Sequence, residues 1–277
     1  MTESVKVTTF INTVFVILLV TSGMLSGTLG EAMYYLAFLI PVAIGFYSSL
    51  GLKYKREEIK GLAEPMDTYH AIDRVRLMKL LPLIAPVVLV VFLTSLVSSL
   101  ILSLFGVSSA PVEDVGLLRM ILIHALTPAI LEEALFRYIP MKLILPYSRR
   151  WCVLYSALCF ALIHCSFVQM PYAFVAGVIF MAVDVALGSA IPSVILHLVN
   201  NAASVVWMKY CAGAIASVIY ISVLVVLAAL SLLVVYKKRE EYLADFRAVF
   251  AKGDSFAVTY APLALVVICF YLAASTL

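Results

Sequence analysis

Residues 116–145 read GLLRMILIHALTPAILEEALFRYIPMKLIL, an apolar run that contains two adjacent glutamates and an arginine. The run exceeds the roughly 20 apolar residues that cross a bilayer as a helix. Glu132, Glu133 and Arg137 would therefore lie within hydrocarbon, where a charged side chain costs about 2.5 to 3.5 kcal/mol on insertion scales. Such groups need partners or a function.

The rest of the chain is equally apolar. Of the 277 residues, 64% are hydrophobic and 13% are charged, whereas soluble domains have about a quarter charged residues. A membrane β-barrel would show alternating apolar and polar residues, which are absent here. The net charge of +3 is too small to indicate a nucleic-acid partner. We predict an all-α, polytopic transmembrane helical bundle of about eight or nine helices, with candidate spans at 8–29, 33–52, 80–106, 116–145, 151–167, 171–188, 190–210, 213–236 and 255–275.

Lysine and arginine predict the orientation of these spans. They are concentrated in segments 53–79, 147–150 and 237–254, whereas the loop 107–116 is acidic. With nine spans, the three basic segments fall on one side, and basic loops favour the cytoplasm. We therefore predict a multi-pass protein of the cell membrane, in contact with membrane lipid, with a cytoplasmic N-terminus.

The last basic segment contains a further candidate helix. Within residues 240–250, apolar side chains recur at helical spacing between charged ones. This pattern predicts either a helix lying on the cytoplasmic leaflet or a solvated connector.

Spacing divides the intramembrane polar residues into groups. Glu133 and Arg137 are four residues apart and share a helix face, so they can form an ion pair. Glu132 is turned by about 100° and faces elsewhere. Glu132 and His164 each lie fifteen residues from the basic turn 147–150, on consecutive antiparallel helices. An acid and an imidazole at one depth can meet.

A second polar pair lies further along the chain. His197 and Asn201 are four residues apart and lie one above the other on a helix. A carboxylate beside an imidazole can deprotonate a water, and a second imidazole with an amide can stabilise an oxyanion. These are the groups of a peptide hydrolase without a nucleophilic side chain. Equally, buried polar residues can simply tie helices together.

Three other polar residues have open interpretations. His124 could extend the site, although a histidine in a helix contact is the favoured reading. Asp184 could line the same cavity or face a loop. Asn200 faces away from Asn201 and could bridge helices.

The motifs resemble those of the CAAX prenyl endopeptidase type II family, also called CPBP or Abi, of intramembrane proteases. Its signatures EExxxR, FxxxH and HxxxN occur in this order on separate transmembrane helices. They match Glu132-Glu133 with Arg137, Phe160 with His164, and His197 with Asn201. The resemblance covers roughly residues 117–205.

The resemblance implies a role for each matched residue. Glu132 would be the general base that activates water, with His164 as its partner. His197 and Asn201 would form the oxyanion site, and Glu133 and Arg137 would support it. Glu132, His164 and His197 could together bind zinc, but the family's usual mechanism is metal-independent, so we expect no cofactor.

These readings divide the chain into three parts. Residues 1–112 would form N-terminal helices, 113–212 the protease core and 213–277 the C-terminal helices. The expected substrate is a peptide or protein segment at the membrane, either a prenylated C-terminus of the CAAX type or a membrane or secreted peptide. The competing class is a non-catalytic immunity or scaffold protein, or a proton-coupled transporter.

Overall fold

The chain folds as a helical bundle. A computed structural model describes residues 2–58, 73–107, 115–146 and 148–250, and none of these residues lies in a strand. This confirms the predicted all-α class. The elements are α1 (Thr2–Met24), α2 (Gly27–Glu58), α3 (Arg74–Ser103), α4 (Leu117–Ile121), η1 (Leu122–Leu126), α5 (Thr127–Glu133), η2 (Ala134–Tyr138), α6 (Ile139–Leu143), α7 (Arg149–Leu162), α8 (Gln169–Leu187), α9 (Ile191–Tyr210), α10 (Ala214–Lys237) and α11 (Arg239–Phe250).

Six described helices are long and apolar enough to cross a membrane, namely α1, α2, α3, α8, α9 and α10. The prediction of eight or nine spans is therefore not confirmed. The predicted span 116–145 is helical but is divided by two π-helical turns, η1 and η2. The span 151–167 was predicted too long, because α7 ends at Leu162. The span 255–275 lies outside the described residues.

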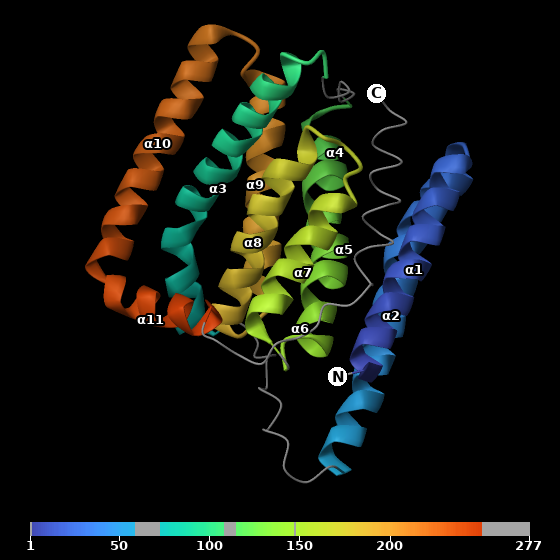
Figure 1. The fold of residues 1–277 in the computed structure, drawn as a ribbon. Helices are drawn as coiled ribbons and strands as arrows, with labels where there is room; N and C mark the ends of the chain where they lie inside the picture. Colours follow the sequence, from blue (N-terminus) through green and yellow to red (C-terminus); the bar gives the residue numbers. More distant parts are fainter. Residues whose placement is uncertain (1, 59–72, 108–114, 147, 251–277) are drawn as a thin grey trace.

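The helices pack as a central group with a peripheral hairpin (Figure 1). α3, α8 and α9 contact one another, and α10 packs against α3 on the outside. α1 and α2 form an antiparallel pair that meets the centre mainly through α6 and η2. Gly45 permits this approach, because a Cβ there would lie 2.6 Å from a methyl carbon of Ile139.

The segment from α4 to α6, residues 117–143, is called here the motif helix. Its two prolines, Pro128 and Pro140, each follow a π-helical turn. A proline has no N–H to donate to the carbonyl four residues earlier, so the α-helical hydrogen bond at that point is missing. Pro140 thereby leaves the carbonyl of Phe136 free, and the Ser156 hydroxyl of α7 donates to it. Pro128 leaves the carbonyl of His124 free in the same way. Prolines are tolerated in membrane helices where neighbouring groups satisfy such carbonyls.

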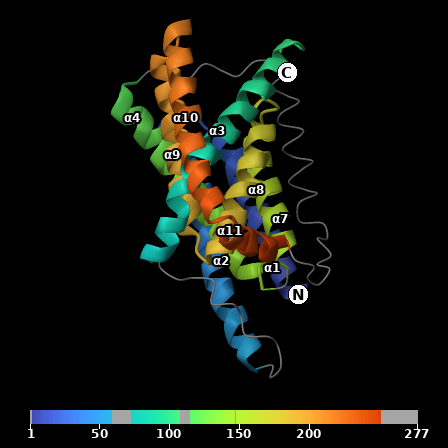
Figure 2. The same ribbon diagram turned by 90° about the vertical axis from the view of Figure 1, so that its left-hand side faces the viewer.

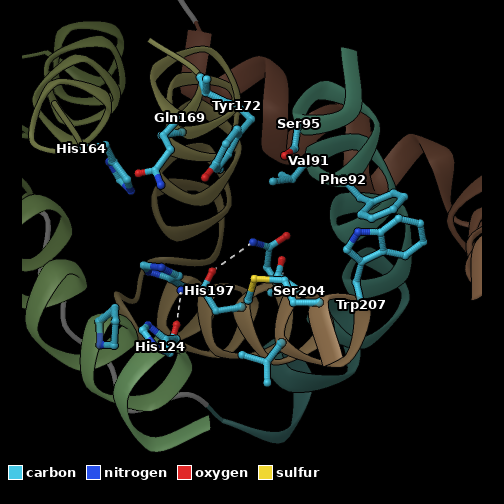
Figure 3. Close-up of a pocket in the computed structure, with 18 of the residues that line it drawn as sticks. Val91, Phe92, Ser95, His124, His164, Gln169, Tyr172, His197, Ser204 and Trp207 are labelled. Carbon is cyan, nitrogen blue, oxygen red and sulfur yellow. Dashed lines mark hydrogen bonds between the residues drawn. The ribbon is translucent and has the colours of Figure 1, made fainter. Parts of the chain in front are cut away.

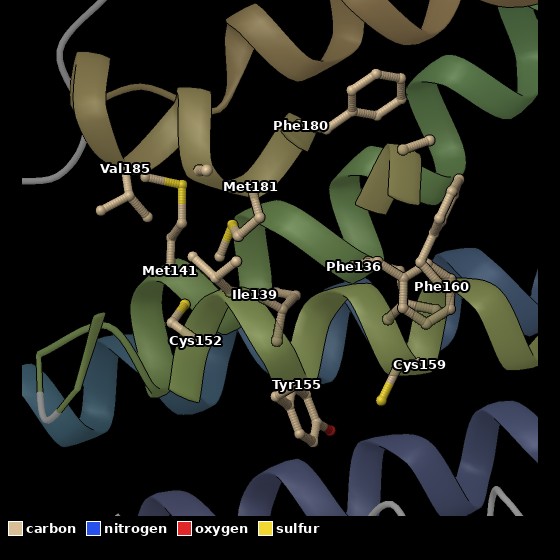
Figure 4. Close-up of a cluster of buried hydrophobic side chains, with 14 of the residues drawn as sticks. Phe136, Ile139, Met141, Cys152, Tyr155, Cys159, Phe160, Phe180, Met181 and Val185 are labelled. Carbon is tan, nitrogen blue, oxygen red and sulfur yellow. The ribbon is translucent and has the colours of Figure 1, made fainter. Parts of the chain in front are cut away.

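The main apolar core lies where α7 and α8 meet the motif helix (Figure 4). Phe136, Ile139, Phe160 and Phe180 are all almost completely buried there. Lipid tails are as apolar as these side chains, so exclusion of water does not drive helices together within a membrane. Close packing holds them together instead. The core therefore fixes the positions of the helices that carry the polar motifs.

Gly177 sets the spacing of α7 and α8. A Cβ at this position would lie 2.7 Å from the Cα of Ala157, a backbone atom that cannot turn away. We expect Gly177→Ala to destabilise the fold by about 2 kcal/mol through overpacking. Denaturation of the purified protein in detergent would measure this. The matched control is Gly213→Ala, because Gly213 has an ordinary φ of −100° and nothing within 4 Å of its Cβ position; equal losses in both variants would contradict the packing argument.

The short helix α11 lies across one end of the bundle (Figures 1 and 2). Its Tyr242 hydroxyl donates to the carbonyl of Lys79, and the Lys79 ammonium lies 2.8 Å from Asp245 and 2.9 Å from Glu241. That ammonium holds the pKa of the Glu241 carboxyl below its ordinary value. Tyr242 and Val249 are buried. Residues 240–250 are thus a docked helix, and the solvated connector was the wrong alternative.

Candidate active site

A cavity of about 670 Å³ lies between α3, α8, α9 and the motif helix. Four of the predicted site residues line it: Glu132, His164, His197 and Asn201. Figure 3 shows His164 on one side of this space, beside Gln169, and His197 on the other. Three separate motifs therefore converge on one cavity, as their spacing predicted.

The two adjacent glutamates point in different directions. Glu132 lines the cavity, and its Oε2 is buried without a hydrogen-bond partner among the described residues. Glu133 is 1% exposed and points away from the cavity, where its Oε2 lies 3.1 Å from Nε of Arg137. The predicted ion pair is confirmed, and the angle of about 100° between neighbouring helix positions separates the two acids.

Arg137 is fully buried between the ion pair and two aromatic rings. Its guanidinium carbon lies 4.3 Å from the ring centre of Phe160 and 5.8 Å from that of Phe180. Although Nε is within ion-pair distance of Glu133, none of the guanidinium nitrogens makes a hydrogen bond of ordinary geometry within the described chain. Coulombic attraction and cation–π contacts therefore balance this buried charge.

His197 connects both acids. Its Nδ1 lies 2.7 Å from Oε1 of Glu133, and its Nε2 lies 4.0 Å from Oε2 of Glu132. A carboxylate at Glu133 accepts the Nδ1 proton and so orients the ring. The rings of Phe160 and Phe180 lie 5.5 and 5.7 Å from it and restrict its movement. His197 is on the second turn of α9, since that helix begins at Ile191.

His164 lies in the turn that follows α7 rather than inside a helix, contrary to the predicted span. Cys165, with a positive φ of 45°, ends the helix at this point. The backbone still turns as it would in a helix, so Nδ1 of His164 donates to the carbonyl of Phe160 at 2.8 Å. This contact occupies Nδ1 and leaves Nε2 as the nitrogen available to the cavity.

Asn201 is held by the carbonyl that Pro128 leaves unpaired. Its Nδ2 donates to the carbonyl of His124 at 3.1 Å, and its Oδ1 accepts from Nδ2 of Asn200 at 3.2 Å. His124 and Asn200 both line the cavity. His124 thus borders the site, the alternative that was not favoured from the sequence, and the helix contact is made by its backbone carbonyl. Asn200 bonds to its neighbour Asn201.

Asp184 occupies neither of its two predicted places. It is fully buried, is not part of the cavity lining, and accepts the backbone N–H of Ser193 at 2.8 Å through Oδ1. Ser193 is in the first turn of α9, whose N–H groups have no partners within the helix. Asp184 therefore fixes the start of the helix that carries His197.

Sequence reasoning missed several residues that line the cavity. Gln169 and Tyr172 share one face of the first turn of α8, and Ser95 and Ser99 share one face of α3. Trp207 closes another part of the wall, and its ring lies 4.9 Å from that of Phe92. The i, i+3 and i, i+4 spacings were visible in the sequence. Nothing in it showed that these helices meet the motif helix.

The described residues contain no group of three or more His, Cys, Asp or Glu side chains arranged to hold a metal ion. His197 directs Nδ1 at Glu133, so only its Nε2 could serve as a ligand in the cavity. Zinc sites need three or four converging ligands at about 2.0 to 2.3 Å. Nε2 of His197 lies 4.0 Å from Oε2 of Glu132, and no third His, Cys, Asp or Glu side chain converges with them among the described residues.

Comparison with known proteins identifies the part of the chain that forms this site. The model of one family, type II CAAX prenyl endopeptidase Rce1-like, matches residues 114–203. No curated protein and no solved structure matches the chain. The matched segment contains all three motifs and the first 13 of the 20 residues of α9. The segment 114–203 of this membrane protein is therefore similar to the Rce1-like type II CAAX prenyl endopeptidase family, which confirms the resemblance that the motifs indicated.

Proposed function

We propose that this protein is a membrane-embedded endopeptidase that hydrolyses a peptide bond with a water activated by Glu132. The observation that carries the proposal is the convergence of Glu132, His164, His197 and Asn201 on one cavity of about 670 Å³. This combines a base, two imidazoles and an amide in a space large enough for a peptide segment. The family model that matches residues 114–203 describes a type II CAAX prenyl endopeptidase, which supports the proposal.

Glu132 is the proposed general base. Glu132 lines the cavity, and its Oε2 makes no hydrogen bond to the described residues, so its carboxylate can accept a proton from a water. Nε2 of His164 can hold the same water, because Nδ1 is occupied by the Phe160 carbonyl. The water oxygen attacks the carbonyl carbon of the scissile bond, and Glu132 takes its proton and later delivers it to the leaving amine. A positioned base of this kind contributes roughly 10²- to 10⁴-fold.

His197 and Asn201 are the proposed oxyanion site. With Nδ1 donating to Glu133, a protonated His197 also offers Nε2–H to the oxygen that becomes negative. Asn201 uses one of its two amide hydrogens for the His124 carbonyl and retains the other for the oxyanion. Glu133 and Arg137 act through His197: they hold its ring without touching the substrate.

A protonated His197, as this mechanism requires, would balance the charges of the cluster. Its imidazolium and the guanidinium of Arg137 would match the two carboxylates, Glu132 and Glu133. An unbalanced charge would be costly in a membrane interior, whereas a neutral set of ion pairs is tolerated. The proposed site lies in the cell membrane, with lipid around it, a cytoplasmic N-terminus and no resident metal.

The proposal can be tested by peptide cleavage with the purified full chain. Quenched fluorescent peptides with and without a prenylated CAAX-type C-terminus are incubated with wild type and with His164→Ala. We expect wild type to cleave at least one peptide and His164→Ala to be slower by about 10²-fold. A chelator should leave the rate unchanged. Equal rates in both proteins would refute the assignment. If the chelator abolishes activity and only zinc restores it, a metal ion activates the water and the proposed role of Glu132 is wrong.

A further inference from the structure

The cavity is confined to one half of the bundle. α3 contributes residues only from Val91–Ser99, in its second half, and α9 only from His197–Met208, beyond its first turn. From α8, which runs antiparallel to α9, the lining residues come from Gln169–Phe180, starting at its first residue. In the motif helix they are His124, Pro128 and Glu132, all in the first two thirds. The cavity thus extends from the level of Glu132 to the far ends of α8 and α9.

The opposite half of the bundle contains the basic chain ends. α3 begins there at Arg74, α7 begins at Arg149 and α10 ends at Lys237, and α11 lies across this end (Figure 1). We call it the basic end. Of the lysines and arginines whose side chains the structure describes, only Arg119 and Lys209 lie near the other end of the bundle. Arg137 is buried between the two ends. The described basic-end residues are Lys6, Arg74, Arg76, Lys79, Lys142, Arg149, Arg150, Lys237, Lys238, Arg239 and Arg247.

This asymmetry orients the cavity in the membrane. Lysine and arginine near the ends of membrane helices are retained on the cytoplasmic side. The basic end is therefore cytoplasmic, and the far ends of α8 and α9 are not. The core around Phe136, Ile139 and Met141 lies between the cavity and the basic end, and all three side chains are almost fully buried. A peptide from the cytoplasm would have to pass through this packed layer.

We propose that the cavity is entered from the non-cytoplasmic face, so that the substrate is a peptide segment exposed on that face. The proposal rests on the endopeptidase function above and narrows its substrate class. A prenylated C-terminus in the cytoplasm would be on the wrong side of the membrane. A secreted peptide, or an extracytoplasmic segment next to a membrane anchor, would be on the correct side.

The cavity wall fits such a segment. Ser95 and Ser99 on α3, and Asn200 and Ser204 on α9, line the cavity with hydroxyl and amide groups at spacings of four residues. An extended peptide has unpaired backbone N–H and C=O groups, which such side chains can satisfy where water is scarce. The indole of Trp207 gives the same wall an apolar part for a side chain of the substrate.

Cysteine labelling from each side tests the direction of entry. Ser99→Cys and Met208→Cys place a thiol in the cavity lining, and both positions are exposed. Arg150→Cys and Arg239→Cys are matched controls at exposed positions of the basic end. A membrane-impermeant charged maleimide is added to right-side-out and to inverted vesicles that contain the full chain, with the parent chain measuring the background of the native cysteines.

In right-side-out vesicles we expect at least about tenfold more labelling of the cavity variants than of the controls, and the reverse ratio in inverted vesicles. Labelling of both cavity variants from the cytoplasmic side would overturn the proposal. So would protection of both from either side while the controls react. Two cavity positions on different helices ensure that one misfolded variant does not decide the result.

The labelling result does not depend on turnover, so it separates this proposal from the endopeptidase function. A chain that labels as expected but cleaves no peptide would refute the function and leave the direction of entry intact. When peptides are supplied outside right-side-out vesicles, we expect cleavage, and the same peptides outside inverted vesicles should remain intact. Cleavage only in inverted vesicles would confirm a protease and overturn the entry from the non-cytoplasmic face.

Discussion

Glu132→Gln is expected to reduce peptide cleavage about 10³-fold, with a fall in kcat and little change in KM. Glutamine has nearly the same shape as glutamate but cannot accept a proton from water. Glu132 is 8% exposed and its Oε2 has no hydrogen bond to the described protein, so the substitution breaks no such contact at that atom. The effect would therefore be chemical rather than structural. Initial rates over a range of peptide concentrations would measure it.

The matched control is Glu31→Gln on α2, the same chemical change at an exposed position. It should retain the wild-type rate. Denaturation in detergent should show the same stability for both variants and wild type. More than about a tenth of the wild-type kcat in Glu132→Gln would mean that another group activates the water, because the loss of a general base costs at least about 10²-fold.

Arg137→Met is expected to destabilise the protein by about 3 to 5 kcal/mol, the largest structural effect we anticipate. The substitution removes the cation 3.1 Å from Glu133 while leaving that carboxylate 1% exposed. It also removes the cation–π contact with Phe160. The carboxylate, left with His197 as its partner, would then have to take up a proton or remain as a buried charge without its guanidinium. Denaturation of the purified variant in detergent measures the loss.

A double variant distinguishes loss of the ion pair from loss of packing. Glu133→Gln removes the negative charge, so Glu133→Gln with Arg137→Met should be less destabilised than Arg137→Met alone. Arg119→Met is the surface control, because Arg119 is exposed on the same motif helix, and it should change stability by less than about 0.5 kcal/mol. If the double variant is as unstable as the sum of the single ones, the charge pair is not the cause.

Much of the site could be predicted from spacing alone. The separation of Glu132 from Glu133 follows from the 3.6 residues of a helical turn. The ion pair of Glu133 with Arg137 forms at the predicted spacing of four residues, although Arg137 lies in the π-helical turn η2. The convergence of Glu132 with His164 followed from equal distances to one basic turn. These features depend on local helix geometry, which the sequence specifies directly.

Features that depend on contacts between distant segments could not be predicted. The bond from His197 to Glu133 joins residues 64 apart in sequence, and the bond from Asn201 to the His124 carbonyl joins residues 77 apart. The predicted number of spans is not confirmed, for a different reason. Pro128 and Pro140 interrupt the α-helical ladder of an apolar run, so hydropathy describes that run as one uniform helix while its backbone alternates between two helix types.

The two prolines also determine which helices around the cavity are held in place and which can move. Each leaves a carbonyl that a side chain of another helix binds, Ser156 of α7 at one and Asn201 of α9 at the other. The motif helix cannot slide or rotate without breaking both bonds. By contrast, the part of α3 that lines the cavity makes no side-chain hydrogen bond to another helix within the described chain. We therefore expect α3 and its outer neighbour α10, rather than the motif helix, to move when the cavity changes shape during substrate entry and product release.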